Sequence, residues 1–328
     1  MAKHMSSSKN DHYVAQTYLK NFSVKGHFGL VNAVQKNNLR VHSKIPVGSL
    51  FSKKHWSRID LWKGNERVVE DYLRHYEPSW NSCVSALISM QFDERTKFLM
   101  SGYIAYLAAC APTAARLAHI STEEFLQLLY DTVERSELRK LSPEARKEVE
   151  AAKRKSDLRN ITVVDDIPKA MGITGLSKYR DSFYSFRWII LQNETSVPFI
   201  TSDNPVCRDY RNGSGCAIYC PISPKYAILI DADKERSERD YDEHRLISLE
   251  GVHYINELVV KSAEKMVIFS DSPDSVLETV KRFQDWHVGL QIFKIPQPRG
   301  EILITRIKAM NEKDYASSHS RLKTIDRK

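Results

Sequence analysis

The hydrophobic pattern of this 328-residue chain changes its period near the middle, and that change limits the folds open to it. From about Glu66, apolar residues recur every three or four positions, which predicts amphipathic helices. After about Phe183 they fall in short runs bounded by Pro, Gly, Asn or Asp, which predicts strands. Runs of helices followed by runs of strands favour an α+β fold. We therefore expect a helical amino-terminal half packed on a mainly antiparallel sheet from the carboxy-terminal half.

Individual segments follow from local signals. A short helix is predicted from His12 to about Asn21, with Asp11 as its N-cap. The turn-forming Lys36-Asn37-Asn38 separates two strand-like runs and predicts a hairpin over 27–45. Later helices are expected over about 93–118 with a bend at Pro112, from Ser121 onward, and over 143–157, 253–265 and 275–286, with strands at 266–270 and 301–308.

We expect a single integrated α+β domain over 11–310. Residues 1–10 read as a disordered tail or a remnant of expression, and residues 311–328 as a flexible basic tail. No apolar run approaches the roughly 20 residues that a membrane-spanning helix needs, and the amino terminus lacks a signal peptide. Five cysteines, an odd number, favour reduced thiols. These features predict a cytoplasmic protein with no membrane partner.

The formal net charge is +8 and the isoelectric point is about 9.1. This balance favours nucleic acid or another phosphate-bearing ligand as the partner. Basic residues are interleaved with aromatic ones between Lys36 and Lys63, a composition that can grip phosphates and stack on bases. A solvated hairpin with a few packed tryptophans would have the same composition, so both interpretations stand.

Several motifs in order along the chain resemble one bacterial protein family. The opening HYVAQTYLKNF (12–22) is similar to the HYVPQ-x-YL-x-NF start of domain-of-unknown-function family number 4238. The resemblance extends to about Ser270 through four later motifs: ERVVEDYLRHYEPSW, FITSDNPV, YCPISPKYAILI and INELVVKSAEKMVIFS. The chain departs from the family pattern at Ala15, where proline is usual, and in YLAACAPTAARL, where many members have a Q-x-x-R-x-P-like pattern. The resemblance implies a shared fold and supplies no activity.

His12 and Gln16 are the first candidate site residues. On the predicted helix they lie one turn apart on the same face. A histidine beside an amide can bind a metal, act as an acid or base, or hold a phosphate. The alternative is a histidine satisfied by hydrogen bonds at the edge of a core.

Glu66, Glu70 and Glu77 fall on one face of the next predicted helix. Gathered carboxylates repel unless a cation joins them, and a divalent metal is one such cation. Helix-surface ion pairs of Arg67 with Asp71 and of Arg74 with Glu70 are the simpler explanation for the first two acids. Glu77, nearer the apolar stripe, is the stronger candidate for function.

The third candidate segment is Thr201-Ser202-Asp203-Asn204-Pro205, which follows a short apolar strand. A polar loop at a strand end is a common place for catalytic residues, although an Asx-type turn would also use Asp203. Asn256 lies near an apolar helical face, where a structural hydrogen bond is the commoner role. No P-loop, G-x-G-x-x-G, H-E-x-x-H or G-x-S-x-G motif is present.

These residues give two hypotheses. The first is a metal-dependent hydrolase of phosphodiesters, nuclease-like, in a bacterial defence or toxin system. Its catalytic residues would be His12, Glu77 and Asp203, with Mg²⁺ or Mn²⁺ on Glu77 and Asp203 and support from Gln16, Ser202, Asn204 and Asn256. The second is a non-catalytic module that binds nucleic acid or a protein through the basic hairpin.

Overall fold

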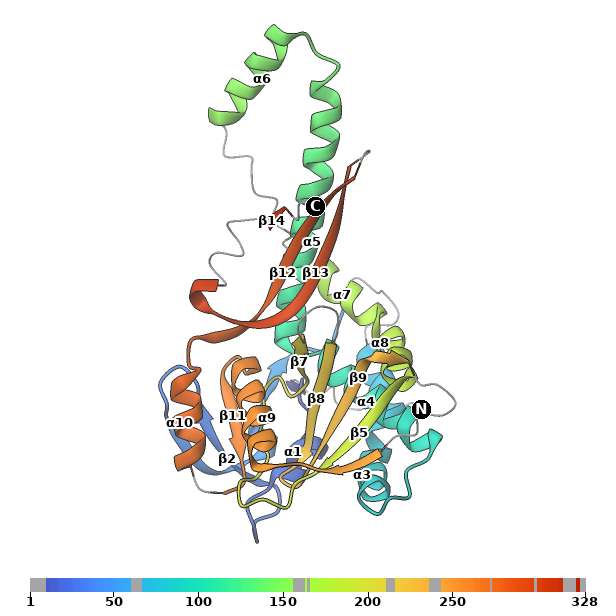
Figure 1. The fold of residues 1–328 in the computed structure, drawn as a ribbon, viewed down its shortest axis with the longest axis vertical. Coiled ribbons are helices and arrows are strands. Elements are labelled where there is room, and N and C mark those ends of the chain that lie inside the picture. Colours follow the sequence, from blue (N-terminus) through green and yellow to red (C-terminus); the bar gives the residue numbers. More distant parts are fainter. Residues whose placement is uncertain are drawn as a thin grey trace, which may run out of the picture.

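A five-stranded sheet, buried on both faces, forms the centre of the molecule (Figure 1). The computed structural model describes residues 10–59, 67–155, 163, 166–210, 216–235, 243–271, 273–297, 300–314 and 323–324. The strand order is β10-β5-β9-β8-β7, and all pairs are antiparallel except β10 with β5. The bounds are β5 Phe186–Gln192, β7 Cys207–Tyr210, β8 Cys216–Ser223, β9 Tyr226–Glu235 and β10 Glu243–Leu246.

Alternate residues of this sheet belong to two different cores, because successive side chains of a strand point to opposite faces. On β5, Trp188 and Ile190 pack with the amino-terminal helices, whereas Ile189 and Leu191 pack with α9 (Leu249–Ser262) and α10 (Asp274–Arg282). The predicted strands of the carboxy-terminal half are therefore apolar on both sides, as a doubly covered sheet requires.

Early and late strands combine in a second sheet, with the order β3-β2-β11-β6. The predicted hairpin is confirmed, since β2 (Leu30–Gln35) and β3 (Val41–Pro46) pair antiparallel. Its inner strand also pairs with β11 (Met266–Phe269), which pairs with β6 (Thr201–Ser202). Helices and antiparallel sheets are thus both present, but strands are not confined to the carboxy-terminal half as predicted. A small sheet joins β1 (Asn10–His12) to β4 (Ser52–Lys54).

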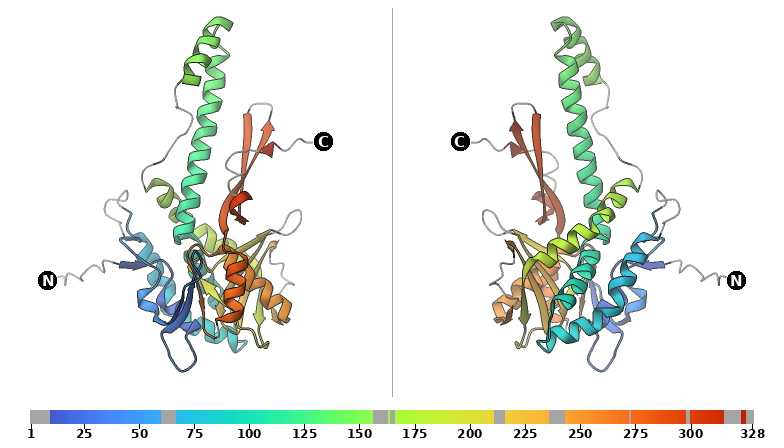
Figure 2. Two further views of the ribbon diagram at one scale, coloured as in Figure 1. Left: turned by 90° about the vertical axis from the view of Figure 1, so that its left-hand side faces the viewer. Right: turned by 90° about the vertical axis from the view of Figure 1, so that its right-hand side faces the viewer.

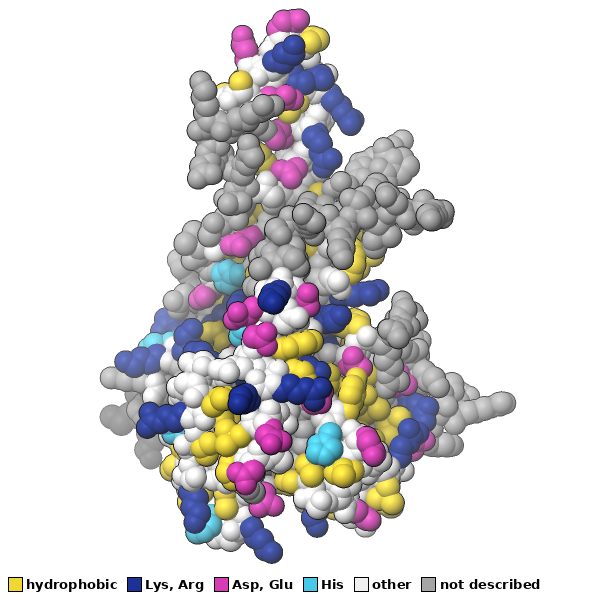
Figure 3. All heavy atoms as spheres, turned by 60° about the vertical axis from the view of Figure 1, so that its left-hand side comes forward, with side chains coloured by type: hydrophobic (Ala, Val, Ile, Leu, Met, Phe, Trp, Pro, Cys, Tyr) yellow, Lys and Arg dark blue, Asp and Glu magenta, His cyan; other side chains and the backbone are white. Residues whose placement is uncertain are grey.

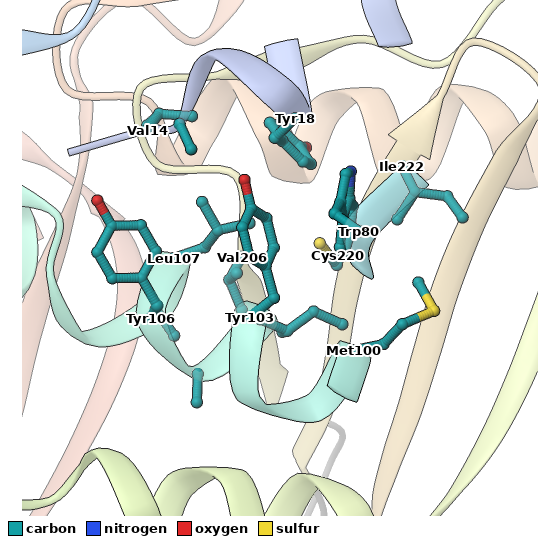
Figure 4. Close-up of a cluster of buried hydrophobic side chains, with 14 of the residues drawn as sticks. Val14, Tyr18, Trp80, Met100, Tyr103, Tyr106, Leu107, Val206, Cys220 and Ile222 are labelled. Carbon is teal, nitrogen blue, oxygen red and sulfur yellow. The ribbon is translucent and has the colours of Figure 1, made fainter. Parts of the chain in front are cut away.

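The larger core lies between the amino-terminal helices and the five-stranded sheet (Figure 4). Tyr18 of α1 (Gln16–Leu19), Trp80 of α3 (Trp80–Ile88) and Tyr103 of α4 (Glu94–Ala109) are each almost completely buried there. The Trp80 and Tyr103 rings stack with 4.3 Å between centroids. Around them lie the short 3₁₀ helices η1 (Lys20–Phe22), η2 (Val47–Ser49) and η3 (Glu77–Ser79), and the helices α2 (Val68–Tyr76), α7 (Ile167–Thr174) and α8 (Leu176–Ser185).

A long helix and a long hairpin project from this body (Figure 2). The helix α5 (Pro112–Leu138) is followed by α6 (Pro143–Lys155), and the hairpin consists of β12 (Trp286–Gln297) and β13 (Gly300–Asn311), with β14 (Lys323–Thr324) beside β12. Leu117 and Ile120 of α5 pack on Val288 and Leu290 of β12, so the two projections touch at their bases. Farther out, both signs of charge alternate with apolar side chains on the helical projection (Figure 3).

Several helix limits differ from the sequence predictions. The predicted helix from His12 is replaced by strand β1 and a helix that begins at Gln16, and Asp11 accepts a hydrogen bond from the Ser57 N–H instead of capping the helix. Ser121 caps no helix, because α5 continues through it from Pro112. Residues 286–297 form strand β12. The sequence predicted no strand there and placed residue 286 at the end of a helix. Residues 1–9, 315–322 and 325–328 of the two predicted tails lie outside the described residues.

Within the described residues, no single helix is long and apolar enough to cross a membrane. The pair α4 and α5, which meet at 64°, passes that test of length and composition only when taken together.

Candidate functional site

His12 lies at the end of β1, where both of its ring nitrogens make hydrogen bonds. Its Nδ1 donates to the Leu50 carbonyl at 2.9 Å, since a carbonyl can only accept. Its Nε2 is 2.9 Å from Gln16 Nε2, an amide nitrogen that can only donate. The predicted contact between the two side chains is therefore present, although it joins a strand to a helix. Both ring nitrogens of His12 are therefore occupied by hydrogen bonds within the fold.

Glu77 lies at the start of η3 and accepts a 2.5 Å hydrogen bond from the Thr17 hydroxyl. The hydroxyl groups of Thr17 and Tyr103 are 3.4 Å apart, so the carboxylate belongs to a small network above the aromatic core. Glu70 pairs with Arg67, and Asp71 pairs with Arg74 at 3.2 Å, so both arginines form ion pairs on the helix surface as expected, but with exchanged partners. Glu66 lies outside the described residues.

Asp203 follows β6 and is 3% exposed. Its Oδ1 accepts from the Glu264 N–H at 3.0 Å and its Oδ2 from the Lys265 N–H at 2.8 Å. The carboxylate therefore fixes the turn between α9 and β11, a long-range contact and not the local Asx-type turn. Burial raises the pKa of Asp203 to about 6, against the opposing effect of the two N–H groups and of Lys36.

Lys36 belongs to the same cluster and is 1% exposed. Its Nζ donates to the carbonyl groups of Ala263, at 2.8 Å, and Trp286. Burial lowers the pKa of Lys36 to about 8, and the nearby charges of Asp203 and Glu264 oppose that change. The sequence predicted that Lys36 lies on a basic surface. The structure corrects this, because its ammonium group bonds the end of α9 to the start of β12.

Three of the four supporting candidates, Ser202, Asn204 and Asn256, make hydrogen bonds in or near the loop after β6 and along α9. Ser202 Oγ accepts from the Asn204 N–H at 3.1 Å, and Asn204 Nδ2 donates to the Ser262 carbonyl at 3.0 Å. Asn256 Oδ1 accepts from the Ile200 N–H at 3.1 Å, and its Nδ2 donates to the Pro198 carbonyl at 2.9 Å. Asn204 and Asn256 thus hold a loop and a strand end against α9, whereas the Ser202 bond is local.

The predicted catalytic residues do not share an interaction: two of them bond α1, and the third bonds the turn after α9. His12 bonds Gln16, Glu77 bonds the adjacent Thr17, and Asp203 bonds the far end of α9. Among the described residues, no three His, Cys, Asp or Glu side chains lie close enough together to hold a metal ion. Mg²⁺ or Mn²⁺ on Glu77 and Asp203 stays a prediction, and it would require both carboxylates to give up hydrogen bonds.

An exposed aromatic side chain is the clearest feature of the amino-terminal surface. Phe28 is 80% exposed at the tip of a loop whose Gly26 and Gly29 have φ of +76° and +80°, values that favour glycine. Lys20 Nζ lies 5.9 Å from the centre of the Phe28 ring. Lys25 and His27 are exposed in the same loop. No sequence pattern singled out Phe28, because it lay within a predicted strand.

Trp56, on the same amino-terminal segment, contacts one lysine of that segment and one of α7. The Nζ atoms of Lys53 and Lys169 are 4.5 Å and 4.7 Å from its ring centre, and its indole N–H donates to the Cys110 carbonyl at 2.6 Å. The ring is therefore held by cation–π contacts and one hydrogen bond. Phe28 is the better stacking platform of the two.

The sequence profile of one protein family matches residues 10–273, and its description is "Protein of unknown function (DUF4238)". The resemblance seen in the sequence motifs is confirmed by this match. No curated protein and no solved structure matches the chain.

Proposed function

Since the chain belongs to this family, whose description assigns no function, we propose its role from its own surface: it is a nucleic-acid-binding module that holds phosphates with the basic residues of 12–59. A single observation carries the proposal. Residues 12–59 contain eight Lys and Arg side chains and no Asp or Glu. The formal charge of this segment therefore equals the net charge of the whole chain, +8. A segment with an excess of positive charge attracts a polyanion.

The exposure of these residues supports the proposal. Lys36 is buried, but the cationic side chains of six others are exposed, and they lie on β3, β4 and the connecting loops: Lys25, Arg40, Lys44, Lys53, Lys54 and Arg58. Lys and Arg side chains and a histidine project from the lower edge of the body (Figure 3), where the amino-terminal loop lies in Figure 1. Phe28 in that loop offers a ring on which an unpaired base would stack. Single-stranded nucleic acid is therefore the favoured partner.

The hydrogen bonds of the predicted catalytic residues support binding over catalysis. Asp203, Glu77 and His12 each make the contacts that a structural role requires. Phosphodiester hydrolysis by a metal ion remains the alternative, and it would need a rearranged site.

The test is binding of a labelled single-stranded oligonucleotide, measured by fluorescence anisotropy over a range of salt concentration. Removing two of these cations in Lys25→Gln/Lys44→Gln should lower the slope of log K against log salt by about 1.4, at roughly 0.7 per phosphate contact. Phe28→Ala should weaken binding at every salt concentration without changing the slope. The matched control, Lys178→Gln/Lys308→Gln, removes the same charge from α8 and β13.

Equal weakening by the control pair would contradict the proposal, because the effect would then come from net charge alone. Cleavage of the oligonucleotide with Mg²⁺ or Mn²⁺, lost in Asp203→Asn, would favour the metal-dependent hydrolase instead.

A further inference from the structure

A pocket of about 210 Å³ lies at the base of the two projections, away from the basic amino-terminal segment. The first turns of α5 form one wall, and β12 and β13 form another. β7 and the loop before it complete the pocket through Asn204, Val206 and Arg208. None of the side chains proposed above for nucleic-acid binding lines it.

The walls of this pocket are mainly apolar. Leu117 on α5, Val288 and Leu290 on β12 and Ile307 on β13 provide the larger surfaces, and alanines at the end of α4 and the start of α5 leave the space between them open. A dry cavity of about 150 Å³ lined by apolar side chains is large enough to hold benzene. The pocket therefore has room for a ring-sized apolar group and a small polar group beside it.

Among the described residues, Arg208 is the one cation that lines the pocket, and no carboxylate lines it. Arg208 is half-buried, and among the described residues its guanidinium makes no hydrogen bond or ion pair. Its neighbours differ in this respect. Arg116 is bound by Glu264 and by the Val288 carbonyl, and Arg306 lies 5.8 Å from the Tyr210 ring centre and 5.4 Å from that of Phe293.

The chemistry of a lone guanidinium in an apolar pocket selects its ligand. The planar fork of arginine binds a carboxylate through two parallel hydrogen bonds. A single positive charge balances a monoanion, whereas a phosphate dianion would keep an uncompensated charge against apolar walls.

We propose that this pocket binds a small organic monocarboxylate, with the carboxylate on Arg208 and a ring-sized apolar body against Leu117, Leu290 and Ile307. The side chain of Arg208 is the group that selects the anion, and the alanine-lined space above it sets the size. This site is independent of the nucleic-acid surface, because the two share no residue.

The test is isothermal titration of the full chain with benzoate, hexanoate, the uncharged benzamide and inorganic phosphate. Either carboxylate should bind at millimolar concentration or better, whereas benzamide and phosphate should not. Arg208→Met should weaken carboxylate binding by roughly 10- to 100-fold, the range for a lost hydrogen bond to a charged group. Arg306→Met removes the same charge from the opposite face of β13 and should leave binding unchanged, because its neighbours Thr305 and Ile307 line the pocket.

The proposal is overturned if neither carboxylate binds, or if benzamide or phosphate binds as well as benzoate does. These comparisons use the unaltered protein, so they hold even where a variant fails to fold. Thr305→Phe, which narrows the pocket without removing the cation, should also exclude benzoate. Undiminished binding to Arg208→Met or to Thr305→Phe would place the ligand elsewhere.

Discussion

The segment from Thr201 to Arg208 separates two polar regions that treat charge in opposite ways. On one side, Asp203 and Lys36 are buried, and their polar atoms bond to backbone groups at the end of α9 and its neighbours. On the other side, Arg208 borders an open pocket, and its guanidinium makes no hydrogen bond or ion pair among the described residues. A buried charge that is not compensated lowers the free energy of unfolding. The comparison teaches that the Asp203 carboxylate is engaged within the fold, while the arginine five residues later makes no hydrogen bond or ion pair among the described residues.

The largest expected effect is the loss of stability on removing the Asp203 carboxylate. Asp203→Ala leaves two backbone N–H groups unsatisfied and removes the charge that faces Lys36. We expect the free energy of unfolding to fall by about 3 kcal/mol or more. Arg208→Met should change it by less than about 0.5 kcal/mol, since no interaction of the described residues is lost. Urea denaturation at pH 7 measures both.

Equal destabilisation by the two variants would break the comparison, because it would mean that Arg208 is bound within the fold. A stable Asp203→Ala variant would return the carboxylate to the list of functional candidates.

A smaller effect follows from the raised pKa of Asp203. The folded protein holds the Asp203 proton up to about pH 6, whereas an unfolded aspartate loses it near pH 3.9. Between these values the folded state binds more protons, so this group makes the free energy of unfolding fall as pH rises, by about 3 kcal/mol in total. Lys36 acts in the opposite direction at higher pH, because its lowered pKa of about 8 makes stability rise from pH 8 to about 10.5.

The measurement is the stability difference between the native chain and Asp203→Asn at pH 4 and at pH 7. Asparagine loses one hydrogen-bond acceptor at every pH, which adds a constant offset, but it does not titrate. The advantage of the native chain should therefore shrink between the two pH values. A difference that stays constant or grows would mean that Asp203 remains charged throughout.

The sequence predicted the local elements better than the site because local signals act within one segment. The alternation and turn residues of 27–45 specified the hairpin, and the helical period specified α4. The same period predicted α2 and α3 as one helix, which η3 divides. The break between α4 and α5 was predicted near Pro112, which is the first residue of α5. The family motif from His12 onward was predicted as well, and the profile match bears it out.

Tertiary contacts decided the rest. Whether Asp203 would act in chemistry or in structure depended on the Glu264 and Lys265 N–H groups, about sixty residues away in the chain. Lys36 looked like a surface cation because nothing in its own turn shows that α9 ends above it. Arg208 follows a buried cysteine in a four-residue strand, so its only sequence signal was a charge within a short β segment. The pocket that Arg208 lines is formed by residues that lie between positions 108 and 309 of the chain, so no local pattern could predict it.

The smallest expected effect compares a glycine in the closed body with one on the pocket wall. A Cβ on Gly102 in α4 would lie 2.2 Å from the Tyr76 ring, and the Tyr76 hydroxyl accepts from Arg180 at 2.9 Å. Gly102→Ala should therefore cost about 1 to 3 kcal/mol, although alanine favours helices. A Cβ on Gly172 in α7 meets nothing within 4 Å, so Gly172→Ala should stabilise the chain by about 0.5 to 1 kcal/mol. Thermal unfolding of the two variants measures whether each substitution raises or lowers stability. A stabilising Gly102→Ala would show that the ring of Tyr76 can move aside and that the packing of α2 on α4 is looser than that of a closed core.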